Sequence, residues 1–148
     1  AEVEALVNDA VERGARLVCG GRRLERAGHF HAPTLLVDVP TEARIMREEP
    51  FAPVAPIAAW DDFDDVITRA NSTDFGLAAY VFTESASLAA RTAEALEAGM
   101  VGINETLLAT AEAPFGGAKQ SGFGREGGSL GILDYLTPKY TRHRLSLA

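Results

Sequence analysis

The sequence predicts an α/β fold, and three observations lead to that prediction. Residues 77–82 and 100–103 form two apolar runs of the length expected for buried strands. Between them, a segment that begins at Ser85 repeats apolar residues at helical spacing until Gly99. Two apolar strands joined by a helical crossover usually lie parallel in one sheet, with a right-handed connection. We therefore expect a strand, helix, strand unit in a mostly parallel sheet.

The first part of the chain is expected to supply one helix and three strands. Apolar residues recur at helical spacing over residues 3–11, and Gly14 provides the left-handed stop that often ends a helix. Residues 17–19 and 34–37 are short apolar runs bounded by glycine or proline, and each is expected to be a strand. Residues 54–60 are also apolar but contain a proline, which fits an edge or bulged strand.

The remaining segments predict two further helices and a terminal strand. Asp61 or Asp62 is expected to cap a helix whose acidic first turn suits the helix dipole. A glycine-rich stretch follows Asn104, and another helix is expected near residues 129–136. Residues 139–145 alternate their side chains as an exposed strand does, and such a strand tends to pair with another chain. We expect an oligomer to supply that chain.

The composition argues against nucleic acid and membrane partners. The 148 residues carry a formal net charge of -7, and the 14 Lys and Arg residues are scattered, so the chain would repel a phosphate backbone. No apolar run approaches the roughly 20 residues that cross a bilayer. The single cysteine, Cys19, fits a reducing compartment, and we expect a cytoplasmic location. Because the chain begins without Met in a helical pattern, we expect a piece of a longer protein.

Three local patterns suggest chemistry, and each has a simpler structural interpretation. The motif GFGREG, residues 122–127, matches the G-x-G-x-x-G of dinucleotide cradles, but no buried strand precedes it, so a tight turn is preferred. His29 and His31 would share one side of a strand, but no spacing completes a metal site, so solvent-facing histidines are expected. Cys19 has no adjacent base, which favours packing over nucleophilic attack.

Two longer stretches are harder to explain as ordinary connectors. In MREEPFAPVAPI, residues 46–57, a pair of carboxylates precedes prolines that restrict the backbone and hold an acid and an aromatic ring rigidly. A carboxylate suits the vicinal hydroxyls of a ribose. In APFGGAKQSGFGREGG, residues 113–128, Phe115 stands between a proline and two glycines that allow a close approach of the backbone to a ligand.

These two stretches, together with ANSTDFGLAAYVFT (70–83) and AGMVGIN (98–104), resemble the C-terminal region of the aldehyde dehydrogenase superfamily. The four motifs follow the family's order and spacing, and the resemblance covers essentially the whole chain. The tail SGFGREGGSLGILDYLTPKY (121–140) is most similar to the succinate-semialdehyde dehydrogenase branch. The resemblance implies that residues 1–136 are the C-terminal portion of a Rossmann-like catalytic domain and that residues 137–148 are an oligomerisation strand.

The resemblance also implies an activity that this chain does not complete. In the family a cysteine thiolate attacks the aldehyde, hydride passes to the nicotinamide of NAD or NADP, and water activated by a glutamate hydrolyses the thioester. The sequence around Cys19, LVCGGRR, does not match the family's nucleophile. That cysteine and the glutamate are expected upstream, so the chain should be inactive alone.

Five residues receive binding roles from the resemblance. It implies that Glu49 accepts hydrogen bonds from the nicotinamide ribose and that Phe51 packs beside the ribose and ring. It places Leu107, Ala109 and Phe115 along the substrate tunnel, where apolar side chains exclude water. Because the semialdehyde branch commonly has serine at the Ala109 position, the donors for a substrate carboxylate are expected elsewhere in the enzyme.

The expected partners follow from the same resemblance. They are a small aldehyde, with succinate semialdehyde favoured, the remainder of the same enzyme, and further copies in a homo-oligomer, either a dimer or a tetramer. No metal is expected. The alternative is a noncatalytic α/β domain that binds a nucleotide or assembles with a partner protein.

Overall fold

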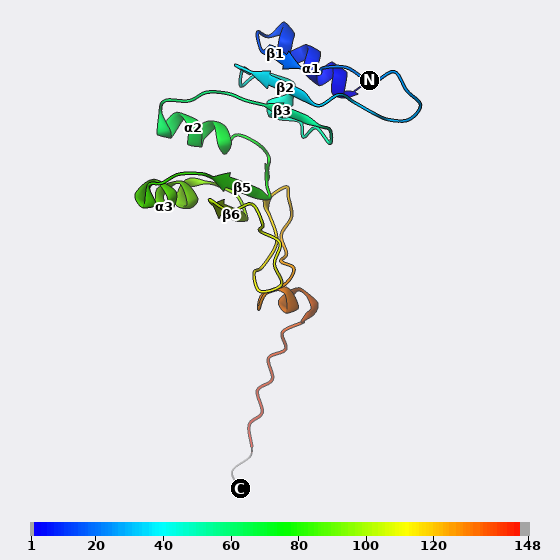
Figure 1. The fold of residues 1–148 in the computed structure, drawn as a ribbon. Coiled ribbons are helices and arrows are strands. Elements are labelled where there is room, and N and C mark those ends of the chain that lie inside the picture. Colours follow the sequence, from blue (N-terminus) through cyan, green and yellow to red (C-terminus); the bar gives the residue numbers. More distant parts are fainter. Residues whose placement is uncertain (1, 146–148) are drawn as a thin grey trace. The chain divides into compact units, whose positions relative to one another are not determined.

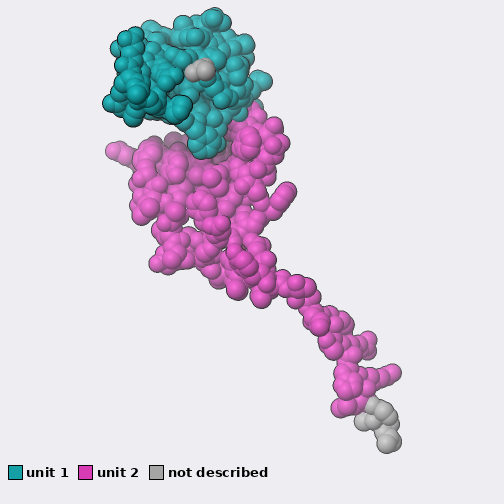
Figure 2. All heavy atoms as spheres, turned by 90° about the vertical axis from the view of Figure 1, so that its right-hand side faces the viewer, with its two compact units in different colours: residues 1–69 teal, residues 70–148 magenta. Residues whose placement is uncertain are grey.

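The computed structural model describes residues 2–145. The chain divides into two compact units, residues 1–69 and residues 70–148 (Figure 2). The boundary expected between residues 136 and 137 stays a prediction. None of the helices in the described part of the chain has the length and hydropathy of a transmembrane span.

Unit 1 is built on a three-stranded sheet. Helix α1 (Glu2–Glu12) comes first and is followed by Gly14 with a left-handed φ of 112°, as the sequence predicts. Strand β1 (Arg16–Cys19) pairs antiparallel with β2 (Thr34–Val37), and β2 pairs parallel with β3 (Val54–Pro56) (Figure 1). The order β1-β2-β3 makes β2 the central strand and β3 an edge strand.

The core of unit 1 joins α1 to the central strand and to the short 3₁₀ helix η1 (Arg44–Met46). Side chains alternate along β2, so Leu36 faces the core with no exposed surface while Leu35 is half-buried. The buried members of this core are Leu6, Val7, Ala10, Ala15, Leu36, Val39, Ala43 and Ile45. This core fixes the position of β2 and, through the pairing of β2 with β3, the segment that leads into β3.

The end of unit 1 agrees with the sequence in one element and differs in another. Helix α2 (Phe63–Ala70) is capped as predicted, because Asp62 Oδ1 accepts a hydrogen bond from Asp65 N at 2.7 Å. The strand expected over residues 54–60 ends at Pro56. Pairing continues only through Ile57, whose N donates to Leu36 O at 2.9 Å, and a proline without N–H weakens the ladder at this edge.

The described residues of unit 2, 70–145, form two separate two-stranded sheets. Strands β5 (Ala78–Val81) and β6 (Met100–Ile103) pair in parallel and are connected by α3 (Ala86–Ala95), so the predicted strand, helix, strand unit is confirmed. Strands β4 (Phe75–Gly76) and β7 (Ala118–Lys119) pair antiparallel. The predicted α/β fold is confirmed, with a mixture of parallel and antiparallel pairs.

The predicted start of α3 is also confirmed. Ser85 has an extended backbone, and its Oγ accepts a hydrogen bond from Leu88 N at 3.3 Å. A serine at this position satisfies a backbone N–H that has no partner inside the first turn of the helix. The helix therefore begins where its local sequence places it.

Some expectations about unit 2 are wrong. β5 and β6 are only half-buried or exposed along most of their length, because a two-stranded sheet has little within unit 2 to cover it. The helix expected over residues 129–136 is a short 3₁₀ turn, η2 (Gly131–Tyr135). Residues 139–145 are exposed and outside any helix or strand of the structure. Their pairing with another chain stays a prediction.

Candidate functional site

Glu49 and Phe51 lie in unit 1, on the turn between η1 and β3. Two short backbone hydrogen bonds shape this turn, from Ala52 N to Pro50 O at 2.7 Å and from Val54 N to Ala52 O at 2.8 Å. The Phe51 ring is 93% exposed. Rigid backbone beneath an exposed acid and an exposed ring is the arrangement that the prolines in this stretch predict.

The two carboxylates of this turn have different environments. Arg44 Nε and Nη2 donate to Glu48 Oε1 and Oε2, each at 2.8 Å, in a bidentate pair. These side-chain hydrogen bonds lower the pKa of Glu48 below its ordinary value of 4.5. Glu49 is exposed and forms no hydrogen bond or ion pair with any residue between 2 and 145. Glu49 is thus the carboxylate of the pair whose acceptor atoms remain open to a ligand.

Leu107 and Ala109 lie in unit 2, in the loop that follows β6. Both side chains are exposed, and Leu107 retains 66% of its surface. Glu105 stabilises the start of this loop, since its Oε1 accepts from Thr106 N at 2.7 Å and from Leu107 N at 2.9 Å. The hydrogen bonds from Leu107 and Thr106 also lower the pKa of Glu105.

Phe115 lies further along the same connection and is half-buried. It forms a two-way backbone bridge with Glu126, in which each N donates to the other's O at 2.7 Å. Phe115 borders a cavity of about 320 Å³, which Leu77, Phe123 and Tyr135 also line. The bridge holds the backbone of the aromatic residue in place at the rim of this space.

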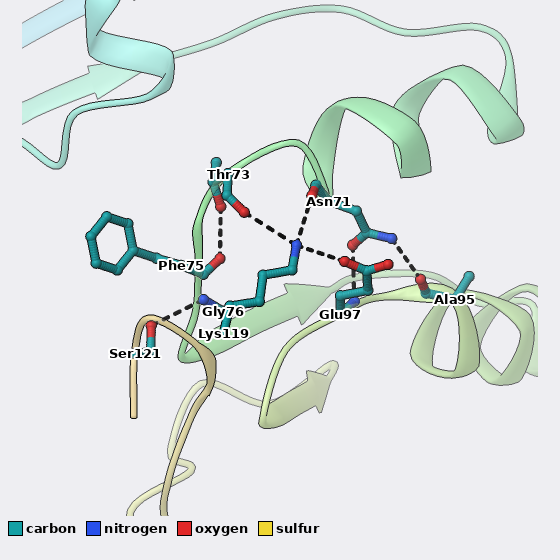
Figure 3. A network of polar contacts seen from close by, with 8 residues as sticks. All are labelled: Asn71, Thr73, Phe75, Gly76, Ala95, Glu97, Lys119 and Ser121. Carbon is teal, nitrogen blue, oxygen red and sulfur yellow. Dashed lines mark hydrogen bonds and ion pairs between the residues drawn. The ribbon is translucent and has the colours of Figure 1, made fainter. Parts of the chain in front are cut away.

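The glycine-rich stretch continues into a segment tied to residues 71–76 (Figure 3). Ser121 Oγ accepts from Gly76 N at 3.0 Å, and Gln120 N donates to Asp74 O at 2.9 Å. These bonds reinforce the β4–β7 pair, whose two strands lie more than 40 residues apart in sequence. The connection that carries Leu107, Ala109 and Phe115 is therefore closed at its far end within unit 2.

The G-x-G-x-x-G pattern has the structural role that the sequence favours. Gly122 and Gly127 have left-handed φ values of 120° and 69°, which a tight turn requires. Asp134 Oδ2 accepts from Arg125 N at 2.8 Å, and a Cβ atom on Gly124 would overlap that carboxylate. In a dinucleotide cradle, a backbone N–H of this turn would donate to a phosphate. Here the N–H of Arg125 donates to the Asp134 carboxylate of the same chain.

The histidines and the cysteine differ from expectation in detail. His31 is half-buried instead of solvent-facing, because its Nδ1 contacts Ala32 O at 2.8 Å. His29 is exposed. Cys19 is exposed rather than packed, at the open edge of β1, and its thiol contacts Pro33 O at 3.8 Å. No group of three or more metal-ligating side chains gathers within residues 2–145.

The five site residues fall into two groups. Glu49 and Phe51 belong to unit 1, while Leu107, Ala109 and Phe115 belong to unit 2. Their convergence around a cofactor and an aldehyde stays a prediction. Sequence reasoning missed the side-chain anchors of Asn104 and Lys119, whose backbone partners lie 21 to 48 residues away.

Comparisons with known proteins match almost the whole chain. Residues 1–141 match the family described as the aldehyde dehydrogenase family. The chain is 53% identical over 140 residues to a succinate-semialdehyde dehydrogenase [NADP(+)] of Escherichia coli and 49% identical over 140 residues to a glutarate-semialdehyde dehydrogenase of Pseudomonas putida. Each alignment covers 95% of this chain and 29% of the relative.

A solved structure shows the same fold. The crystal structure of an NADP-dependent enzyme of E. coli superposes with a TM-score of 0.88 at 52% identity, covering 92% of this chain and 28% of that one. The chain thus spans less than a third of the length of the relatives that it matches. The motifs, the fold and the relatives agree: this chain belongs to the aldehyde dehydrogenase family.

Proposed function

We propose that this chain is the C-terminal portion of an NAD(P)-dependent aldehyde dehydrogenase that oxidises a semialdehyde to the carboxylic acid. The observation that carries the proposal is the family match over residues 1–141, together with about 50% identity to semialdehyde dehydrogenases. Identity of this degree to oxidoreductases argues against the alternative of a noncatalytic binding or assembly domain. The catalytic cysteine and the general-base glutamate are expected in the rest of the enzyme.

The residues of unit 1 fit one end of a dinucleotide. Glu49 offers an exposed carboxylate with no partner among residues 2–145, and such a group can accept two hydrogen bonds from the vicinal hydroxyls of a ribose. Phe51 offers an exposed ring that can pack against the ribose and the nicotinamide. When bound, NAD or NADP accepts the hydride, and Glu49 and Phe51 would orient the nicotinamide for that transfer.

The residues of unit 2 fit the aldehyde side. Leu107 and Ala109 are apolar and exposed in this segment, and Phe115 has a fixed backbone. We propose that they line the substrate tunnel and exclude water from the reacting carbon. Both relatives are named for aldehydes that carry a terminal carboxylate, and succinate semialdehyde is our first candidate substrate. Because Ala109 offers only a methyl group, the donors for that carboxylate would come from elsewhere in the enzyme.

The cofactor, assembly and location are also proposals. NADP is the first cofactor to test, because it appears in the name of the E. coli relative, and NAD is the second. We expect a cytoplasmic homo-oligomer, a dimer or a tetramer, in which residues 137–148 pair with another subunit. Exposed apolar side chains such as Tyr140 and Leu145 support that pairing.

A substrate panel tests the proposed reaction. The complete enzyme that carries this segment would be assayed with succinate semialdehyde, glutarate semialdehyde and neutral aldehydes of equal length, each with NAD⁺ and with NADP⁺. We expect higher kcat/KM for the semialdehydes. A preference for neutral aldehydes would overturn the substrate assignment, and reduction of neither cofactor with any aldehyde would overturn the proposed function.

Glu49→Gln tests the cofactor role of unit 1, and Glu48→Gln is the matched control on the neighbouring carboxylate. The amide keeps the shape of Glu49 but loses the charge that strengthens its hydrogen bonds, so kcat/KM should fall about 10- to 100-fold with the fold intact. Glu48→Gln removes only an exposed pair with Arg44 and should leave the kinetics unchanged. Equal kinetics for wild type and Glu49→Gln would remove Glu49 from the site.

A further inference from the structure

The chain between β6 and the end of β7 is flanked by residues with an unusual backbone. We call residues 105–118, which run from the start of this connection into the first residue of β7, the pocket loop. Among residues 2–145, the non-glycine residues with left-handed φ are Asp38, Asn104 and Lys119, at 56°, 53° and 54°. This conformation is unfavourable for residues with a Cβ atom, although Asn and Asp tolerate it better than others. Asn104 directly precedes the pocket loop and Lys119 directly follows it.

The side chain of Asn104 anchors the first end of the pocket loop. Its Nδ2 donates to Thr83 O at 2.9 Å, and its Oδ1 accepts from Thr83 N at 2.9 Å. Asn104 N also donates to Val81 O at 2.8 Å. The side-chain amide therefore takes the place of a neighbouring strand residue and extends the β5–β6 pairing. Hydrogen bonds of both the backbone and the side chain of Asn104 therefore fix the point at which the loop leaves β6.

The chain then reverses over β6. A Cβ atom on Gly102 would overlap Glu105 O and would lie 3.1 Å from Leu108 Cδ2, so only glycine leaves room for this reversal. The two hydrogen bonds from Thr106 N and Leu107 N to the Glu105 carboxylate then fix the first turn of the loop. The path of the chain from β6 to Leu107 thus depends on the position at which Asn104 holds the start of the loop.

The side chain of Lys119 anchors the second end of the pocket loop (Figure 3). Lys119 Nζ donates to Asn71 O at 2.7 Å and to Thr73 O at 3.2 Å, and it pairs with Glu97 Oε2 at 2.6 Å. The side chain of Lys119 is 25% exposed, so this ammonium group is partly removed from water. The three partners satisfy its three N–H donors, which compensates for that removal.

Two of the three partners of Lys119, Asn71 and Glu97, are joined by a second side-chain amide (Figure 3). Asn71 Nδ2 donates to Ala95 O at 2.8 Å, and Asn71 Oδ1 accepts from Glu97 N at 2.9 Å. Asn71, which follows α2, is therefore joined to Ala95 at the end of α3 and to Glu97 just beyond it by bonds that do not involve Lys119. Lys119 thus holds the end of the pocket loop on acceptors from two segments that are also bonded to each other.

We propose that Asn104 and Lys119 are positioning residues that hold the two ends of the pocket loop and thereby set where Leu107, Ala109 and Phe115 meet the aldehyde. This inference rests on the proposed function for the role of those three residues. Each anchor bonds to distant segments of the chain, and in this proposal it affects the substrate only through the position of the loop. Loss of either anchor would let the loop shift, and a shift of about 1 Å in a substrate-binding group can cost on the order of 100-fold in rate.

Glycine substitutions separate the anchoring side chains from the strained backbone. Asn104→Gly and Lys119→Gly keep the left-handed conformation and remove only the side chain. Asp38→Gly is the matched control, since Asp38 has the same conformation in the other unit and, within the described residues, its side chain forms only an exposed 3.8 Å pair with Arg16. All three changes would be made in the complete enzyme that carries this segment.

Two readouts are needed, steady-state kinetics with aldehydes of increasing length and amide hydrogen exchange. Asn104→Gly and Lys119→Gly should each lower kcat/KM for the aldehyde about 10- to 100-fold and alter the preferred aldehyde length. They should also speed exchange within residues 105–118 while α1 keeps its protection. Asp38→Gly should change neither readout.

The outcomes distinguish this inference from the proposed function. Unchanged aldehyde kinetics, or slower turnover without faster exchange in residues 105–118, would overturn the positioning role. If the wild-type enzyme oxidises no aldehyde, the proposed function fails, while the exchange data still decide whether the two side chains hold the loop. Should a glycine variant not fold, Asn104→Asp and Lys119→Met preserve side-chain size, remove the hydrogen bonds to Thr83 O and to Asn71 O, and are held to the same outcomes.

Discussion

Truncation of Leu36 should destabilise unit 1 far more than truncation of its neighbour Leu35. Both are leucines in the central strand β2, but Leu36 is fully buried in the core with Val7 and Ile45 while Leu35 faces the other side and is half-buried. Leu36 also pairs with Pro56 of β3, the strand that follows the turn carrying Glu49 and Phe51. The comparison therefore tests which face of β2 supports the candidate cofactor residues.

The magnitude follows from the atoms removed. Leu→Ala deletes a methine and two methyl groups, and burial of each carbon contributes roughly 0.8 kcal/mol, so the transfer loss at Leu36 is about 2.4 kcal/mol. The cavity left in a packed core raises the total to about 3 to 4 kcal/mol. The half-buried Leu35 should lose about 1 kcal/mol, because less of its surface leaves water on folding. The expected difference is about 2 kcal/mol.

Urea unfolding of the purified chain measures this difference, with the fluorescence of its single tryptophan, Trp60 in unit 1, as the signal. A difference of about 2 kcal/mol corresponds to a separation of about 1 M or more between the midpoints of Leu36→Ala and Leu35→Ala at equal slope. Equal midpoints, or a larger loss for Leu35→Ala, would show that the core of unit 1 does not lie on the Leu36 face.

Two further predictions concern pH and backbone strain. The pKa of Glu105 is lowered in the folded state by hydrogen bonds from Leu107 N and Thr106 N, so its stabilising effect is present above the unfolded pKa and is lost as pH falls through the folded pKa. A carboxyl titration by NMR should place that midpoint below 4.5, with the Leu107 amide signal following it; a midpoint at or above 4.5 would contradict the turn. Gly14→Ala, at φ 112° in open space, should cost roughly 1 to 2 kcal/mol, as is typical of left-handed backbone. Gly20→Ala should cost more in the same unfolding measurement, because its Cβ would also overlap Pro33 O, and equal losses would refute the close approach.

The elements that the sequence predicts well are those specified by neighbouring residues. The first helix with its Gly14 stop, the strand Thr34–Val37, the Ser85 cap and the strand Met100–Ile103 all follow from local spacing and capping chemistry. Such signals act within a few residues, so the rest of the fold adds little to them. The motifs around Glu49 and Phe115 likewise indicate the family from the sequence alone.

The tertiary structure decided those features that depend on contacts between residues far apart in sequence. The strand expected over residues 54–60 ends at Pro56 because its ladder depends on β2, and the helix expected near residue 130 is only a 3₁₀ turn beside the Asp134 contact to Arg125. Nothing near Lys119 in the sequence marks a lysine whose acceptors are 46 and 48 residues away. Local patterns determine helices, strands and caps, because their energies come from adjacent residues. Long-range hydrogen bonds and burial determine the position of each loop, because only folding brings hydrogen-bonding groups that are distant in sequence into contact.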